Sequence, residues 1–213
     1  VIAAEFQEFL MNGTLYQGSK PVMWSPVEKT ALAEAEVEYH DKESFTVWVK
    51  FQVVGTGDAT LDSAKVVIWT TTPWTMPSNK AVVYGAGISY GLYEVIGRPE
   101  ECWARIGERF ILSDALAEDV LGRARLEPSM YRRLCDITSE DLAKIQLLHP
   151  LHGVEGGAGE WDDIRDFRAA DFVTDSEGTG FVHCAPSHGM EEFELYRDLG
   201  MLEQVITYNV MED

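Results

Sequence analysis

Residues Val66–Thr75 read VVIWTTTPWT, an apolar, β-branched run that passes directly into three threonines. Such a run is typical of a buried strand. Hydroxyls at a strand end can point at a ligand, because threonine both donates and accepts hydrogen bonds. Alternation along the chain puts Thr70 and Thr72 on one face and Thr71 on the other, and Pro73 keeps Thr72 extended. The alternative interpretation is that threonine is simply a good strand former.

Outside this run, the pattern predicts a fold that is mainly β with a few helices, and barrel-like. Further strands are predicted at residues 45–54, 81–84, 90–95, 172–174 and 180–183. Helices are predicted at residues 5–10, 30–35, 115–121 after an N-cap at Ser113, and 189–199. Four glycines within Gly153–Gly159 indicate a surface loop.

A second informative stretch, Gly178–Gly189, reads GTGFVHCAPSHG. Its glycines permit close approach to a ligand or a tight turn. His183 ends a predicted strand and could be a general base, a metal ligand or part of a pocket wall. His183 and His188 lack acidic or thiol partners at ligand spacing, so no metal site is predicted. Cys184 adjoins His183, but neighbouring strand residues point to opposite faces, which places the two poorly as a catalytic dyad.

Helical periodicity distinguishes two adjacent acids in the last predicted helix. Glu191 shares its side of the helix with other acids and is expected to face solvent. Glu192 lies at i+3, i+4 and i+7 spacing from apolar residues and therefore borders the buried stripe. A carboxylate there could bind a cation, or it could only cap the helix, whose dipole favours negative charge in the first turn.

The 213 residues, 46% of them hydrophobic, are enough for a folded domain. We expect a single domain over residues 1–213, with residues 1–20 as a connecting segment, and the absence of an initiator Met indicates a fragment of a longer protein. No continuous apolar run is long enough for a membrane span. Three widely spaced cysteines are typical of a reduced, cytoplasmic protein.

Several motifs together resemble the editing insertion of isoleucyl-tRNA synthetases, within the class I aminoacyl-tRNA synthetase family. Residues Lys20–Pro26 (KPVMWSP) and Thr30–Tyr39 (TALAEAEVEY) resemble the beginning of that insertion. Residues Thr70–Asn79 resemble its threonine-rich peptide, and Gly178–Gly189 resembles its second editing motif. The landmarks follow the family's order from residue 20 to 200. The absence of Arg after the threonines favours the isoleucine branch over the valine and leucine branches.

The resemblance implies a hydrolase that removes valine wrongly esterified to isoleucine tRNA, on a β-barrel-like editing domain. Thr70, Thr71 and Thr72 would position the terminal adenosine, the ester and the attacking water. His183 and Trp74 would exclude isoleucine by size, and the Glu192 carboxylate would bind the substrate's α-ammonium. The synthetic signatures of the family are absent, so no aminoacylation is expected. No metal and no cofactor are implied.

The sequence departs from the family at two positions. The family usually has Asp where Glu192 stands, and the extra methylene would shift the carboxylate by about an ångström, which can cost roughly 100-fold in rate. Many relatives carry a Trp-Cys-Pro-x-Cys pair near the beginning of the insertion. Ser25 and Glu28 replace those thiols here, so a zinc site is not expected.

The charge balance limits how this chain can bind a nucleic acid. Acidic residues outnumber basic ones 36 to 17, giving a net charge of −19, whereas phosphate binding needs Lys and Arg. We therefore expect weak binding to the 3′ end of tRNA, presented by the rest of a synthetase. The competing hypotheses are a catalytically weakened or inactive tRNA-positioning or structural module, and a free-standing editing protein.

Overall fold

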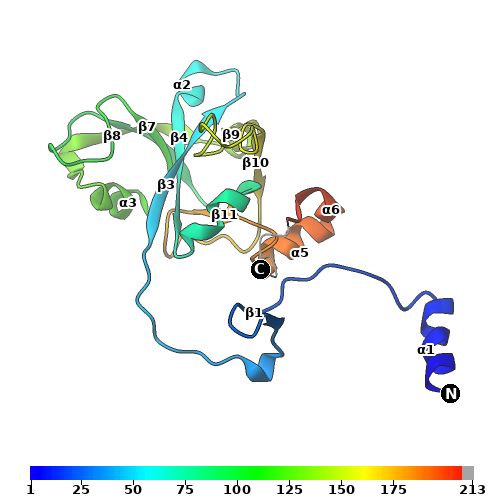
Figure 1. The fold of residues 1–213 in the computed structure, drawn as a ribbon. Coiled ribbons are helices and arrows are strands. Elements are labelled where there is room, and N and C mark those ends of the chain that lie inside the picture. The colour runs from blue at the N-terminus through cyan, green and yellow to red at the C-terminus, as the bar shows by residue number, and fades with distance from the viewer. Residues whose placement is uncertain (208–213) are drawn as a thin grey trace. The chain divides into compact units, whose positions relative to one another are not determined.

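The computed structural model describes residues 1–207, which the contacts between Cα atoms divide into two compact units (Figure 1). The first unit is Val1–Tyr39, and the second begins at His40. Each is described by itself. The expectation of one domain over residues 1–213 stays a prediction, and its last six positions lie outside the described residues.

The first unit contains little regular structure. Helix α1 spans Ile2–Met11 and ends at Asn12, in agreement with the predicted helix. Strands β1 (Trp24–Ser25) and β2 (Thr30–Ala31) form a two-stranded antiparallel sheet. The helix predicted at residues 30–35 is therefore wrong: the first two residues pair in β2, and only a 3-10 turn forms at Glu34–Glu36. A single short helical segment has too few hydrogen bonds to offset the cost of its first turn.

The second unit is built on one mixed sheet. Across the described residues its nine strands are β3 (Val47–Val54), β4 (Ala64–Thr70), β5 (Ala81–Tyr84), β6 (Tyr90–Val95), β7 (Arg109–Ser113), β8 (Tyr131–Ile137), β9 (Gln146–Leu148), β10 (Ile164–Ala169) and β11 (Phe181–Cys184). The helices are α2 (Ala59–Asp62), α3 (Ala117–Arg123), α4 (Ser139–Leu142), α5 (Met190–Asp198) and α6 (Leu202–Val205), with 3-10 helices at Pro73–Ser78 and Pro128–Met130. The predicted class, mainly β with a few helices, is confirmed.

The strand order is β11-β5-β10-β9-β3-β4-β7-β6-β8. Most pairs are antiparallel, whereas β10 with β5 and β4 with β7 are parallel. The sheet curls so that β11 also lies against β4, although no ladder joins these two strands. The hydrogen-bonded order therefore has two ends, and the sheet is not a closed barrel. The curl brings the end of β4 close to the end of β11.

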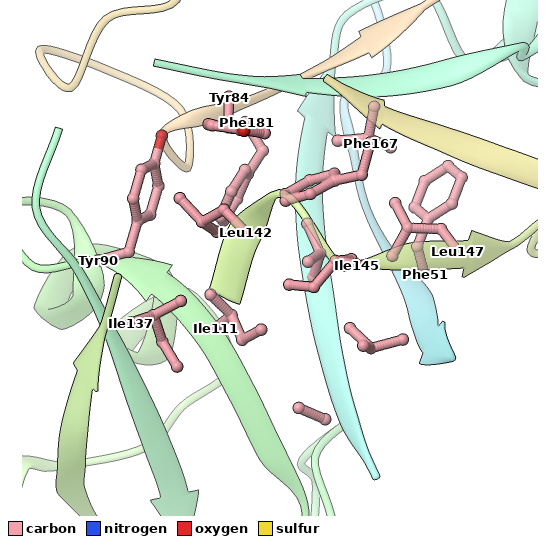
Figure 2. Close-up of a cluster of buried hydrophobic side chains, with 14 of the residues drawn as sticks. Phe51, Tyr84, Tyr90, Ile111, Ile137, Leu142, Ile145, Leu147, Phe167 and Phe181 are labelled. Atoms are coloured by element: carbon pink, nitrogen blue, oxygen red, sulfur yellow. The ribbon is translucent and has the colours of Figure 1, made fainter. Parts of the chain in front are cut away.

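The main core fills the inside of this curled sheet. Figure 2 shows Phe51, Tyr90, Ile111, Leu147 and their neighbours converging from several strands. Two smaller clusters lie elsewhere: one packs α3 against β6 and β7, and the other packs α5 and α6 against β5 and β11. The second of these anchors α5 beside β11, which positions the candidate site.

One predicted helix boundary and one predicted strand are wrong. Ser113 is not a helix N-cap, because it still belongs to β7 and pairs with Tyr90, so α3 starts only at Ala117. Residues 172–174 do not form a strand. These residues follow β10. Strand β5 already pairs with β10 on one edge and with β11 on the other, so it has no free edge for a further strand. Val173 is nevertheless buried, because it packs against the sheet. Among the described helices, none has the length and apolar character needed to cross a membrane.

Candidate functional site

The two informative stretches of the sequence meet at one pocket of about 500 Å³. The end of β4 and the turn after it form one side, and the end of β11 with the start of α5 forms the other. Lining side chains come from Trp69, Thr70, Thr71, Thr72, Trp74, Thr75, Val182, His183, Ala185, His188, Gly189 and Glu192. All the predicted site residues are in this set. No Lys or Arg lies among these lining residues.

The three threonines differ in their surroundings. Thr70 is buried, and its Oγ1 accepts a hydrogen bond from the Thr72 backbone N–H at 3.1 Å. The Thr72 hydroxyl lies 3.3 Å from the same oxygen, so the predicted common face of Thr70 and Thr72 is confirmed. Thr71 is exposed, and its hydroxyl makes no hydrogen bond within the part of the chain that the structure describes. Thr71 was predicted on the opposite face, but it lines the same pocket as Thr70 and Thr72, and it presents a free donor and acceptor there.

The backbone turns sharply after the threonines. Thr72 has φ −126° and ψ 64°, which is not helical but is less extended than Pro73 alone predicts. Pro73 opens a 3-10 helix, a position where its missing N–H costs nothing. That turn places Thr75 inside, where its hydroxyl donates to the Thr72 carbonyl at 2.8 Å. Trp74 points outward and is 67% exposed, so it stands at the rim of the pocket.

His183 is held at both ring nitrogens. The side-chain amide of Asn79 donates to Nδ1 at 2.7 Å, so the ring carries its proton on Nε2, which lies 3.0 Å from the Thr75 hydroxyl. Burial lowers the pKa of His183 to about 4, and the nearby His149 and His188 act in the same direction. The ring is therefore neutral at neutral pH, with both nitrogens engaged by the protein. Of the roles left open by the sequence, this geometry suits a rigid pocket wall.

Glu192 lies at the start of α5, where the sequence placed it. Glu191 is exposed, whereas Glu192 is half-buried and lines the pocket, so the distinction drawn from periodicity is confirmed. Burial raises the pKa of Glu192, and its own backbone N–H opposes that change. The carboxylate folds back over Gly189, in the space that a side chain at that position would need. The contact of this carboxylate with its own backbone N–H and its place in the pocket therefore coexist.

Cys184 takes no part in this pocket. It is fully buried on the opposite face of β11, within the cluster that packs α5 against the sheet. Burial raises the pKa of its thiol, and the Glu192 carboxylate adds to this increase. A thiol that stays protonated is a poor nucleophile. The structure thus agrees with the sequence-based rejection of a Cys184–His183 dyad.

Sequence reasoning missed the residues that support the site. Thr75 and Asn79 hold the ring of His183, and Trp69 and Ala185 complete the wall. Thr75 follows Thr72 by three residues, which is one turn of a 3-10 helix. A 3-10 helix predicted after Pro73 would therefore have placed the Thr75 side chain on the same side as Thr72, facing the site. For Asn79 the sequence carries no such signal, since its partner lies on a distant strand. Within residues 1–207 no group of three acidic, His or Cys side chains could hold a metal ion.

Comparisons with known proteins agree with one another. A family model described as tRNA synthetases class I (I, L, M and V) matches residues 1–190. The isoleucine–tRNA ligase of Ruegeria pomeroyi is 76% identical over the whole chain, which covers 22% of that relative. The corresponding ligase of Rhodopseudomonas palustris is 49% identical, again over the whole chain and 21% of the relative. The chain thus spans about a fifth of the length of these curated relatives.

Solved structures share the fold at low sequence identity. The structure of GlLeuRS-CP1 has a TM-score of 0.53 at 17% identity, covering 76% of this chain and 64% of the other. The editing domain of the cytosolic leucyl-tRNA synthetase of P. knowlesi has a TM-score of 0.51 at 13% identity, covering 78% of this chain and 66% of the other. The curled mixed sheet is therefore a known fold.

Proposed function

Because the chain belongs to the class I tRNA synthetases of the isoleucine, leucine, methionine and valine group, we propose that it hydrolyses the ester of valine mischarged onto isoleucine tRNA. The observation that carries this proposal is the convergence of four threonine hydroxyls, two histidine imidazoles and one carboxylate in a single pocket. Their chemistry matches an aminoacyl ester, which offers an ammonium, a carbonyl and a ribose.

Size selection explains why such a second site is needed. A pocket that fits isoleucine cannot strongly reject valine, since one methylene is worth only roughly 1–3 kcal/mol, and this pair is the standard case of that limit. A smaller pocket that admits valine and excludes isoleucine corrects the error. The ring of His183 is held by Asn79 and Thr75, so it would not move aside to admit a larger side chain. Trp74 lies at the rim of the pocket.

The hydroxyls provide orientation and electrostatic stabilisation in place of a covalent nucleophile. Thr71 has a free hydroxyl that can hydrogen-bond the developing oxyanion or the attacking water. Thr72 can position the ester and the ribose of the terminal adenosine, with Thr70 behind it holding its backbone N–H. Positioned donors in a partly enclosed site contribute substantially to acyl-transfer catalysis, and orientation adds to this effect. No metal or cofactor is required.

Glu192 would bind the α-ammonium of the amino acid. It is the one acidic side chain among the described residues that line the pocket, and no Lys or Arg there neutralises it. Half-burial strengthens its attraction for a cation, because water screens the charge less. The ammonium would also replace part of the hydration that burial removes from the carboxylate.

The rest of the substrate would be held outside this chain. A net charge of −19 disfavours binding of a tRNA body, so only the aminoacylated 3′ end is proposed to enter. Other parts of a full-length, cytoplasmic isoleucine–tRNA ligase would carry the tRNA and form its aminoacyl bond. The similarity over a fifth of such ligases supports this arrangement.

One observation favours a second candidate function. The carboxylate of Glu192 folds toward its own helix start, so part of its charge already has a partner. A carboxylate committed to capping would leave the ammonium unbound. The chain would then be a catalytically weakened or inactive module that positions tRNA or supports the enzyme.

Ester hydrolysis separates the two candidates. Valyl- and isoleucyl-esters of isoleucine tRNA are incubated with the full-length protein that carries this chain, and with its Glu192→Ala and Glu191→Ala variants. Editing predicts that the unmodified protein and Glu191→Ala hydrolyse only the valyl ester, and that Glu192→Ala does not. A valyl ester left intact by the unmodified protein would instead support the inactive module.

A further inference from the structure

The two residues that hold the His183 ring are carried by one short element. Thr75 lies within the 3-10 helix Pro73–Ser78, and Asn79 follows its last residue. Six residues is long for a 3-10 helix, because its hydrogen bonds are poorly aligned. Contacts from elsewhere in the chain are therefore needed to keep this turn in one place. They come from residues 149–165.

His149 holds the end of this helix. The ring is buried, and burial lowers its pKa, so it is neutral at neutral pH. The Leu151 backbone N–H donates to Nδ1 at 3.0 Å, which places the ring proton on Nε2. Nε2 then donates to the Met76 carbonyl at 2.9 Å. The same carbonyl accepts the backbone N–H of Asn79 at 3.0 Å. His149 is therefore bonded to the peptide group that closes the last turn, next to the side chain that holds His183.

Trp161 makes a second contact with the same helix. Its Nε1–H donates to the Pro77 carbonyl at 3.0 Å. Its ring also stacks on that of His149, with centroids 6.1 Å apart and planes 18° apart. The two stacked rings thus bind two consecutive carbonyl groups, those of Met76 and Pro77. A turn held at two adjacent peptide groups has little freedom to shift.

The loop that carries Trp161 is fixed by contacts of its own. Arg165 is buried, and its guanidinium donates to the carbonyls of Asp163 at 3.0 Å and Glu160 at 3.3 Å, on the two sides of Trp161. A Cβ at Gly157 would lie 2.9 Å from the Trp161 ring, closer than van der Waals contact permits. The glycine therefore lets the loop pack closely against the indole.

We propose that His149 and Trp161 are positioning residues for the size selection attributed to His183. Through two carbonyls of the 3-10 helix they fix the turn that holds the imidazole, and so set how far this wall extends into the pocket. Neither residue lines the pocket, so both would act through the wall and not on the substrate. The size selection rests on the proposed function, whereas the link from His149 to the wall does not.

Two substitutions of His149 differ in the one hydrogen bond at issue. His149→Leu removes the donor to the Met76 carbonyl, whereas the side-chain amide of His149→Gln can donate from the place of Nε2. Both variants lose the acceptor for the Leu151 N–H. The full-length protein and each variant are assayed with valyl- and isoleucyl-esters of isoleucine tRNA. His149→Leu is expected to lower the ratio of valyl to isoleucyl kcat/KM roughly 10-fold, since one methylene in a pocket is worth about 10- to 200-fold. His149→Gln should keep the ratio.

Two further variants complete the series. Trp161→Phe keeps an aromatic ring beside His149 but removes the donor to Pro77, and should lower the ratio by a smaller factor. Val120→Ala creates a cavity in the cluster around α3 and serves as the control for a loss of stability alone, so its ratio should not change. An unchanged ratio in His149→Leu, or an equal fall in His149→Gln or Val120→Ala, would overturn the proposal.

Hydrogen exchange separates failure of this inference from failure of the proposed function. If the unmodified protein hydrolyses neither ester, the proposed function fails, and amide exchange in the full-length protein still tests the link to the wall. The backbone N–H groups of Thr75 and Asn79 are bonded to carbonyls within the turn, and should exchange faster in His149→Leu than in His149→Gln. Equal deuterium uptake by both variants in peptides covering residues 73–79 would overturn the positioning role.

Discussion

The amide of Asn79 donates to Nδ1 of His183 across 2.7 Å, and the same nitrogen donates to the Ala81 carbonyl at an equal distance. Both residues are buried. The contact fixes which ring nitrogen carries the proton and ties the ring to the start of β5. The proposed discrimination by a single methylene requires a rigid wall, and this contact is one source of rigidity.

Replacing Asn79 with Ala should loosen that wall. The change leaves His183 Nδ1 and the Ala81 carbonyl without their donor, so the free energy of unfolding should fall by about 1–3 kcal/mol. The ratio of valyl- to isoleucyl-ester hydrolysis should fall as the ring gains freedom. Urea unfolding and hydrolysis of both esters measure these effects, with Ser78→Ala as the neighbouring control. An unchanged ratio in a destabilised variant would show that the ring keeps its position without Asn79.

The stability of the chain should decrease as the pH falls below about 6.5. The pKa of His183 is about 4 in the folded state and near 6.5 when unfolded, so the unfolded state takes up the proton first. The difference between these two pKa values adds about 3 kcal/mol to the free energy of unfolding above pH 6.5, and this increment is lost as the pH approaches 4. Unfolding free energies measured across this window should show a smaller slope in His183→Gln. The pKa values of His149 and His188 are also lowered, so some slope will remain.

Binding of the substrate ammonium should weaken as the pH falls. Because the pKa of Glu192 is raised, this weakening should begin at a higher pH than it would for a solvent-exposed Glu. Burial raises the pKa of Glu192 above its usual 4.5, and only the ionised carboxylate attracts the ammonium. The KM for valyl-tRNA should therefore rise as the pH falls toward this raised pKa. In Glu192→Gln the KM should already be high and nearly independent of pH. A Glu192→Gln variant with the normal KM would mean that the ammonium binds elsewhere.

Adding a methyl group at residue 189 should displace the carboxylate. The Cβ of Gly189→Ala would meet the Glu192 carboxylate group, which must then move. Displacement by about an ångström should lower kcat/KM for valyl-tRNA by roughly 10- to 100-fold. In the double variant Gly189→Ala/Glu192→Asp the acidic side chain is shorter by one methylene, so its carboxylate no longer meets the new Cβ. The double variant should therefore regain part of the lost kcat/KM. Equal activity of the single and double variants would argue against this steric link.

The two threonines at the end of β4 should respond differently to loss of their hydroxyls. Thr71→Val removes the free, exposed hydroxyl, and should lower kcat roughly 10- to 1,000-fold without affecting stability. Thr70→Val removes the acceptor for the Thr72 N–H, and should cost about 1–3 kcal/mol of stability and less in rate. Single-turnover hydrolysis and urea unfolding distinguish these effects. A fully active Thr71→Val would remove that hydroxyl from the mechanism.

The sequence predicted those parts of the fold whose signal is local. The apolar run before Thr70 and the alternation through Val53 identified β4 and β3, and helical periodicity separated Glu192 from Glu191. Strand β8 was missed because most of its side chains are exposed and give no apolar pattern. The strand predicted at residues 172–174 failed because an apolar segment beside a sheet can be buried without pairing.

The candidate site shows the same division between local and distant information. The threonines, His183 and Glu192 could be named because each lies in a recognisable stretch of sequence. The support from Asn79 could not, since it depends on which strands become neighbours. The contact between Trp48 and Trp69 could not be predicted either, because these two residues meet only through the register of β3 and β4.

The pairing of β5 with β11 also sets the order in which the site can form. The bonds from His183 to Asn79 and Thr75 join residues 104 and 108 positions apart, so a long loop must close before either exists. Closing such a loop is slow and has a high entropic cost, whereas the β3–β4 hairpin needs only local contacts. The threonines can therefore be in place while the imidazole wall is still missing. The proposed selectivity for the smaller amino acid would therefore arise only once β11 has joined the sheet.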